Sequence, residues 1–304
     1  MPEPALLAEL PEAQADGETR RIYREIRRCS AVPMVALIYR HLATMPGVLE
    51  WAWAAIGPLM QSGELPQRAW QLAAAAHIPG AAAMARAALR STGITQADEG
   101  AIVAVLDAYN RANPVNILAV RCLAHLLRDE GQGARARPDE PVGPAAPAGP
   151  VAFATATAWQ SPPEPAPLPS MLAPQAMGGE LRALVLLLTD RNDGRAPSPL
   201  WPSLYRHLAN WPALLAFASV VVPPEFVAID AAAARLRAAV EVSAAELARR
   251  LAWPAAVAAP AGAERLQLLQ AIDRFSQRIP EMVVIGGLLR RAMPATAPPC
   301  AEAA

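Results

Sequence analysis

The sequence has few of the residues that bind metals or form disulfides. It contains 3 cysteines and 4 histidines in 304 residues. Cys29, Cys122 and Cys300 are odd in number, far apart and without a C-x-x-C pair. No histidine lies at zinc-ligand spacing from them. These absences exclude a disulfide framework and a dithiol that reduces peroxides, and we expect neither a metal nor another cofactor.

The chain also has no excess of either charge and no long apolar run. Its 27 Lys and Arg residues equal its 27 Asp and Glu residues, so no basic surplus is left to neutralise nucleic-acid phosphates. Apolar runs such as 213–222 meet a proline well before the roughly 20 residues that cross a bilayer. The N-terminus is acidic and unlike a signal peptide. We therefore expect a soluble, cytoplasmic protein that binds neither nucleic acid nor membrane.

Aromatic residues and long β-branched runs are scarce as well, whereas Ala, Leu and Arg are abundant. This composition favours helices over strands. Ile22 and Ile26 lie on one stripe of the segment 17–28, with charged residues opposite, which is the pattern of an amphipathic helix. No segment shows the alternation of a half-buried strand over a useful length. The sequence therefore predicts an all-α fold.

Caps and prolines predict where helices begin and end. Thr95 with Asp98 has the spacing of a helix start, and Ser243 with Glu246 has the spacing of a capping box. Proline removes a backbone donor and disfavours helix in the residue before it. We therefore expect helices to be separated at Pro33, Pro46 and Pro58, and at the prolines that correspond to them later in the chain.

One helical motif occurs twice. The segments 33–46 and 199–212 share a central YRHLA, and both begin and end with proline. The same offset of 166 residues aligns 107–123, "DAYNRANPVNILAVRCL", with 273–289, "DRFSQRIPEMVVIGGLL". Because one register fits blocks so far apart, the chain contains an internal repeat.

The repeat divides the chain into five parts. We expect an arm at 1–16, two helical repeats of about six helices each at 17–130 and 178–293, and a tail at 294–304. The segment 131–177 between the repeats is rich in Pro and small residues, which favours an extended linker over the surface. The repeats then form an intramolecular pseudo-dimer with a pocket between them, and the whole chain is a monomer or a homodimer.

The duplicated histidines His41 and His207 lie in the shared YRHLA. A group that both copies of a scaffold retain is explained by architecture, since an asymmetric reaction needs each catalytic group once. We therefore interpret this segment as a packed helix, with leucine and alanine in the core and its Arg and His at the edge.

Three blocks of the sequence resemble the group I 2-haloacid dehalogenases. They are 17–59, with "IYREIR" and "LATMPGVLEWAW", then 87–123, with "LRSTGITQADEGAIVAVLDAYNRANPVNIL", and then "LANWPALLAF" at 208–217. The resemblance spans nearly the whole chain apart from the linker. It implies an all-helical pseudo-dimer with the active site between the repeats. It also implies a reaction in which an Asp activates water to displace halide at C2 of a 2-haloacid, without a covalent intermediate.

The resemblance assigns roles to particular residues. The Asn that orients the water precedes a proline in this family, which places it at Asn113. The catalytic Asp falls on Leu204, after Ser203, and leucine accepts no proton; losing a general base typically costs on the order of 100- to 10,000-fold in rate. The substrate-binding walls implied by the resemblance are Met34, Leu37, Asn116, Ser203, Phe275, Arg278 and Ile279. The family more often has aromatic residues at the first two and Tyr at the third.

Three groups are candidates to compensate for the missing Asp. Asp193 could serve as the base if its loop folds back, and Glu64 could assist, although solvation at the surface also explains it. Arg278 adds a cation that suits an anionic ligand, unless it only reaches solvent.

Three functions therefore stay open. The chain could be a dehalogenase that uses Asn113 and an unrecognised base. It could be a degenerate relative that binds a small organic acid, or an interaction module. In the first two cases the partner is a small-molecule carboxylate.

Overall fold

The computed structural model describes residues 8–79, 83–130, 162–163, 166–189 and 201–294. In these ranges every regular element is a helix, so the predicted all-α fold is confirmed. The first repeat contains α1 Gly17–Ser30, α2 Leu37–Leu42, α3 Val48–Gln61, α4 Glu64–Ala75, α5 Arg86–Ser91 and α6 Gln96–Glu130. The second contains α7 Gly179–Thr189, α8 Ser203–Leu208, α9 Pro212–Val221, α10 Phe226–Ala248 and α11 Gly262–Ala292. Three short 3-10 helices are η1 Glu12–Gln14, η2 Pro174–Ala176 and η3 Pro223–Glu225.

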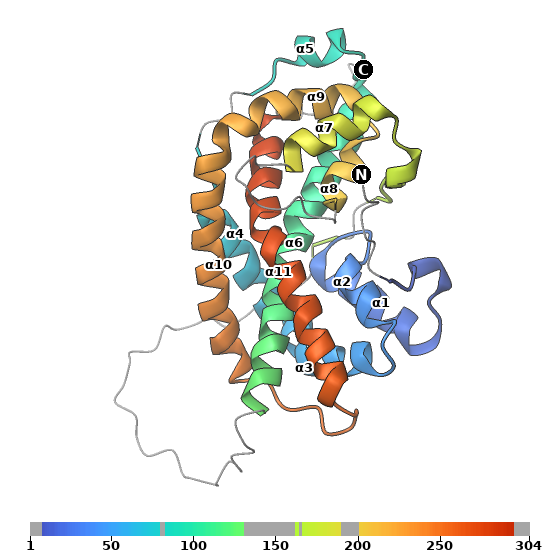
Figure 1. Cartoon of the computed structure of the whole chain (residues 1–304), viewed down its shortest axis with the longest axis vertical. Coiled ribbons are helices and arrows are strands. Elements are labelled where there is room, and N and C mark those ends of the chain that lie inside the picture. Colours follow the sequence, from blue (N-terminus) through green and yellow to red (C-terminus); the bar gives the residue numbers. More distant parts are fainter. Residues whose placement is uncertain (1–7, 80–82, 131–161, 164–165, 190–200, 295–304) are drawn as a thin grey trace, which may run out of the picture.

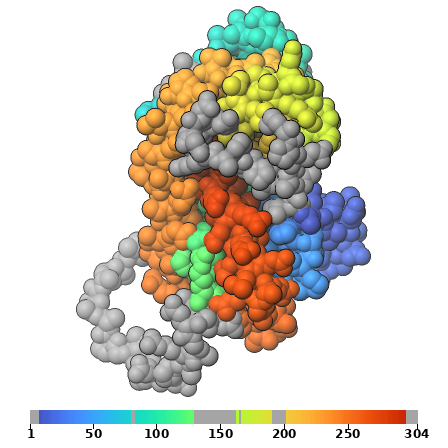
Figure 2. All heavy atoms as spheres, viewed as in Figure 1, coloured from blue at the N-terminus to red at the C-terminus, as the bar shows by residue number. Residues whose placement is uncertain are grey.

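The long helices α6 and α11 run side by side through the centre of the molecule (Figure 1). They are antiparallel, because Asp107 of α6 contacts Arg290 of α11 whereas Arg121, further along α6, contacts Asp273. The helix α10 packs against both. Figure 2 shows the orange surface of α10 and the red surface of α11 on one face, with a green strip of α6 between them.

The offset of 166 residues recurs in the helix boundaries. Adding it to α2 gives the residue range of α8, and adding it to the first residue of α6 gives the first residue of α11. The ion pairs follow the same rule. Asp107 pairs with Arg290 at one end of the α6–α11 contact, and Asp273, its counterpart, pairs with Arg121 at the other end. These matches support the predicted repeat and its approximate twofold relation.

One of the two predicted caps is correct. Thr95 immediately precedes α6; its Oγ1 lies 3.1 Å from the backbone N of Asp98, and the Asp98 carboxylate accepts from the Thr95 backbone N–H at 2.9 Å. This is a reciprocal capping box. The second prediction was wrong, because Ser243 lies inside α10 rather than at its start. Its hydroxyl accepts a hydrogen bond from Arg68 of α4 at 3.2 Å.

Proline boundaries are also only partly as predicted. Pro46 lies between α2 and α3, but Pro58 is inside the last turn of α3. Pro114 and Pro280, which correspond at the offset, lie inside α6 and α11. A proline within a helix removes one hydrogen bond and crowds the preceding turn. The burial of the surrounding side chains outweighs this cost in all three helices.

The stretch Pro212–Ala248 is long and apolar enough to cross a membrane by length and composition alone, with a mean hydropathy of 1.8 in its most apolar part. In the structure it is not one straight helix. Pro223 and Pro224 form η3 between α9 and α10, and the two helices run in different directions (Figure 1). Because α10 also packs against α6, α11 and α4, the apolar residues of this stretch are explained in part by packing at a corner of the bundle.

The last part of the predicted linker packs against the helices. The backbone N–H of Leu172 donates to the carbonyl of Arg206 in α8 at 3.2 Å, and the Arg206 side-chain Nε donates to the Leu172 carbonyl at 3.0 Å. Asn210 donates to the Ser170 carbonyl at 3.0 Å. We call residues 166–172 the strap. The segments 131–161 and 295–304 lie outside the described residues.

Candidate ligand pocket

A pocket with a volume of about 1070 Å³ lies between the two repeats. The first repeat contributes the loop before α2 and one face of α6, and the second contributes α8, α10 and α11. The strap adds Pro167, Leu168, Pro169 and Met171. All nine site residues named from the sequence line it, namely Met34, Leu37, Asn113, Asn116, Ser203, Leu204, Phe275, Arg278 and Ile279. Residues from far apart in the sequence therefore meet around one cavity.

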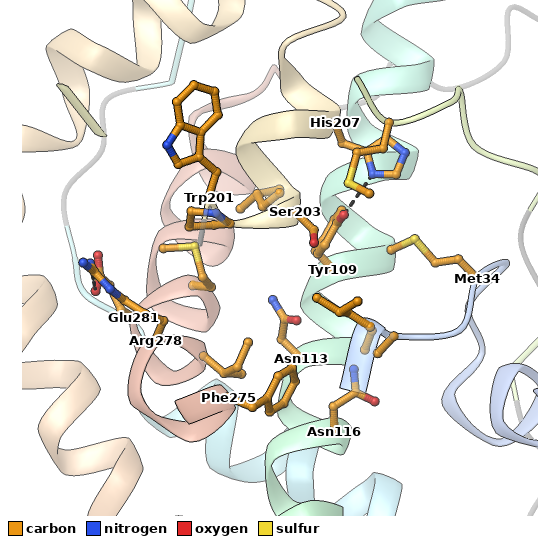
Figure 3. A pocket seen from close by; sticks show the side chains of 18 of the residues that line it. Met34, Tyr109, Asn113, Asn116, Trp201, Ser203, His207, Phe275, Arg278 and Glu281 are labelled. Carbon is orange, nitrogen blue, oxygen red and sulfur yellow. Dashed lines mark hydrogen bonds and ion pairs between the residues drawn. The ribbon is translucent and has the colours of Figure 1, made fainter. Parts of the chain in front are cut away.

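Two amides of α6 belong to the wall of this pocket. Asn113 and Asn116 are 7% and 3% exposed, and they are three residues apart, so both project from the same side of the helix. Neither side chain makes a hydrogen bond to any residue that the structure describes. Figure 3 shows the Asn113 amide pointing into the open centre of the pocket. Because a buried amide without a partner is costly, these groups are suited to a ligand or to water.

Leu204, at the position expected for a catalytic Asp, lies in the first half of α8 and is 1% exposed. It belongs to a cluster of buried apolar side chains that includes Leu208, Ile285 and Leu288. Such a site disfavours an ionised carboxylate. Within the described residues, no carboxylate makes a hydrogen bond to Asn113.

A buried hydrogen-bond chain lies beside Asn113. The Nδ1 of His207 is 2.9 Å from the Tyr109 hydroxyl (Figure 3). Its Nε2 is 2.7 Å from the carbonyl oxygen of Pro169. A carbonyl accepts only, so Nε2 carries a proton and Tyr109 donates to Nδ1 of a neutral ring. Ser203 is a further hydrogen-bond partner of Tyr109. Burial lowers the pKa of His207 and raises that of Tyr109, so both stay neutral near pH 7.

The duplicated histidine is therefore used differently in the two halves. His41 is half-buried, and its Nδ1 lies 2.8 Å from the Ala8 carbonyl. His207 is buried and lines the pocket. The interpretation of YRHLA as a packed helix holds for Leu42 and Leu208, which are buried, but placing both histidines at the edge was wrong. Sequence symmetry could not show that the strap covers only one of them.

Most of the cations at the pocket already have partners. Arg278 makes an ion pair with Glu281 at 3.3 Å, and Arg40 makes one with Glu9 at 3.0 Å. Arg237 donates to the Gln277 carbonyl at 3.1 Å. Arg278 is thus not the isolated cation that its sequence position suggested, because Glu281 is one turn further along the same helix.

Of the two carboxylates proposed as substitutes for the missing Asp, only Glu64 belongs to the described residues. Glu64 makes a surface ion pair with Arg250 and does not line the pocket. Asp193 lies outside the described residues. The lining does contain Asp230, an exposed residue of α10. Among the described residues, no cluster of His, Cys, Asp and Glu is arranged to hold a metal.

Comparison with solved structures identifies the fold. A D-2-haloacid dehalogenase mutant in complex with D-2-CPA superposes with a TM-score of 0.64 at 20% identity, covering 96% of this chain and 99% of that one. Another mutant, and the complex of a D-2-haloacid dehalogenase with L-LA, give TM-scores of 0.63 and 0.62 at 20% identity. Both alignments cover 96% of this chain, with 98% and 99% of the other chains. This chain has the fold of a D-2-haloacid dehalogenase.

No protein-family model and no curated protein sequence matches the chain significantly. At 20% identity the dehalogenase fold is established, whereas the chemistry of its pocket must be argued from the residues of this chain. The dehalogenase fold explains why the nine residues named from the sequence meet, since eight of them lie on helices around the pocket and Met34 lies in the loop before α2.

Several pocket residues of this dehalogenase fold escaped the sequence reasoning. The offset aligns Tyr109 with Phe275, and this difference in polarity marks Tyr109 as a candidate asymmetric group. No comparable signal distinguishes Asp230 or Arg237, which are two of several charged residues on the alanine-rich helix α10. The strap has only the composition of a linker, so nothing in its sequence places it over a pocket.

Proposed function

We propose that the chain binds an organic acid in this pocket and does not cleave carbon–halogen bonds. The observation that carries the proposal is the burial of Leu204 where the resembling enzymes have their base. A leucine that is 1% exposed in an apolar cluster neither accepts a proton from water nor orients it. The amide of Asn113 is retained nearby, but it can only hold a ligand or a water molecule.

The remaining groups support binding rather than water activation. The ring of His207 is a potential base in the lining, but burial lowers its pKa and Tyr109 already donates to its Nδ1. Its other nitrogen is held by the Pro169 carbonyl. A water molecule therefore finds no vacant basic nitrogen on this ring, whereas an acid finds donors in the amides of Asn113 and Asn116.

The first test is halide release from D- and L-2-chloropropionate by the purified protein. We expect no release above the buffer rate. We also expect short carboxylates to stabilise the wild type in thermal-shift assays, and Asn113→Leu to lose this stabilisation. Release at an enzymatic rate would refute the absence of a base, and a protein that binds no carboxylate at all would refute the binding role.

Two variants test whether the missing carboxylate explains the inactivity. Leu204→Asp restores the acid, but it places a charge in an apolar cluster and will lower the stability. Ser203→Asp introduces the acid one residue earlier, where the side chain lines the pocket and is only half-buried. We expect measurable halide release from at least one of these two variants that folds. We expect none from Ser203→Asn, whose side chain has the size of the aspartate in Ser203→Asp but no carboxylate.

A further inference from the structure

The pocket is much larger than a 2-haloacid requires. Its volume of about 1070 Å³ is about seven times the roughly 150 Å³ that holds a benzene molecule. Because 2-chloropropionate has as many non-hydrogen atoms as benzene, it would leave most of this space to water. The volume instead corresponds to pockets for drug-sized ligands, which typically reach about 1,000 Å³.

Part of the lining suits the apolar portion of a ligand. Met34, Met171 and Met282 come from the loop before α2, from the strap and from α11, so flexible thioether side chains surround the space. Methionine adapts its shape to apolar ligands of different outline. Leu168, Trp201 and Ile279 extend the apolar lining between them.

The polar groups without partners are concentrated at one place. Asn113 and Asn116 are buried, lie one turn apart on α6 and make no hydrogen bond within the described residues. The half-buried Ser203 hydroxyl, which bonds to Tyr109, belongs to the same lining. Charge-assisted hydrogen bonds from such groups hold a carboxylate well, and amide nitrogens donate without bringing a charge of their own.

We infer that the ligand is a medium- or long-chain carboxylic acid, with its carboxylate at Asn113 and Asn116 and its hydrocarbon chain along the methionine-lined wall. This inference rests on the proposed binding function and specifies its ligand class. A fatty acid and a chain that ends in an aromatic ring share this chemistry.

Affinity across a homologous series tests the length of the ligand. Binding is measured by calorimetry, below the micelle concentration, for propionate, hexanoate, decanoate and tetradecanoate. A phenyl-terminated acid is included to distinguish a fatty acid from a ligand that ends in an aromatic ring. We expect the affinity to rise by up to about fourfold per added methylene until the pocket is filled. If propionate binds but lengthening the chain gives no gain, the long-acid inference is wrong while the binding proposal stands. If no member binds, both are wrong.

Head-group variants test the position of the carboxylate. Asn113→Leu and Asn116→Leu keep the side-chain size, and each should weaken decanoate by about tenfold or more while changing decanol by less than threefold. Arg274→Gln, at the exposed edge of the pocket, should change decanoate by less than threefold. A larger loss for Arg274→Gln than for the asparagine variants would place the carboxylate at the edge and overturn this orientation.

A bulky substitution tests the path of the chain. Met34→Trp fills part of the wall and should weaken tetradecanoate by at least tenfold with little effect on propionate. Met45→Trp is the matched control, because Met45 is also partly buried, lies outside the pocket lining and corresponds at the offset to Trp211. If both variants bind tetradecanoate as the wild type does, the chain does not follow this wall.

Discussion

At the scale of single residues, identical side chains in the two repeats differ in what surrounds them. His207 is buried and bonds to Tyr109 and the Pro169 carbonyl, whereas its counterpart His41 is only half-buried and bonds to the Ala8 carbonyl. Burial lowers the folded-state pKa of His207 below its ordinary value of 6.5. As the pH falls from 6.5 towards this lowered value, the unfolded chain binds a proton that the folded chain does not. This group therefore contributes stability that is present above pH 6.5 and is lost on acidification.

We predict that His207→Asn reduces the loss of stability on acidification. The free energy of unfolding is measured by urea titration at about pH 7.5 and about pH 5, within the range where histidine titrates. The wild type should lose more stability between the two conditions than His207→Asn, although the variant starts lower because it disturbs the pair with Tyr109. His41→Asn is the control and should follow the wild type. An equal loss in all three proteins would show that the His207 ring is not buried in solution.

Tyr109→Phe removes the hydrogen that Nδ1 of His207 accepts. We expect this variant to lose about 1–3 kcal/mol of unfolding free energy, because a buried acceptor is left without a donor. Tyr23→Phe provides the comparison, since the Tyr23 hydroxyl donates at 3.0 Å to the carbonyl of Leu10. Leu10 is only half-buried, so water can replace the lost donor and the cost should be smaller. The two values come from urea unfolding at neutral pH. A smaller cost for Tyr109→Phe would contradict the hydrogen bond assigned to it.

At the scale of elements, a capping motif acts only where a helix begins. The spacing of Thr95 with Asp98 and that of Ser243 with Glu246 are alike in sequence, yet the first opens α6 and the second lies within α10. We predict that Thr95→Ala costs about 1 kcal/mol in unfolding free energy, within the usual range of 0.5–2 for a lost cap. Ser243→Ala should cost less, because Ser243 lies inside α10, where the backbone N–H groups that a cap would serve are already bonded within the helix. A larger cost for Ser243→Ala, measured in the same urea assay, would contradict this difference.

The sequence predicted the positions of the helices better than the contacts that their side chains make. Composition and periodicity were sufficient for an all-α fold, and one constant offset anticipated that α2 and α8, like α6 and α11, begin at corresponding residues. The pocket lining followed from the resemblance, because facing helices bring its residues together. Pairing of Arg278 with Glu281 and closure by the strap depend on rotamers and tertiary contacts, which sequence spacing does not specify.

At the scale of the whole molecule, the two repeats do not have separate cores. One cluster of buried side chains combines Trp51 and Leu118 of the first repeat with Leu236 and Ile272 of the second. The other cluster combines residues of α6 with residues of α8, α9 and α11. Because an independent domain needs a core of its own, neither repeat has what it needs to fold without the other.

This sharing predicts that the chain unfolds in one cooperative transition. Calorimetry should give a single heat-absorption peak with a calorimetric enthalpy close to the van't Hoff enthalpy, as for a two-state domain. Leu236→Ala, which alters a residue of the second repeat in the mixed core, should lower the unfolding midpoint of the entire molecule, with a cost of about 2–5 kcal/mol for a buried leucine. Leu266→Ala is the control, because Leu266 is 62% exposed. Two resolved peaks, with only one displaced by Leu236→Ala, would mean that the repeats are independent domains joined by a linker. The pocket would then lie between two domains that can separate. A single transition would instead mean that the pocket is lost only when the whole molecule unfolds.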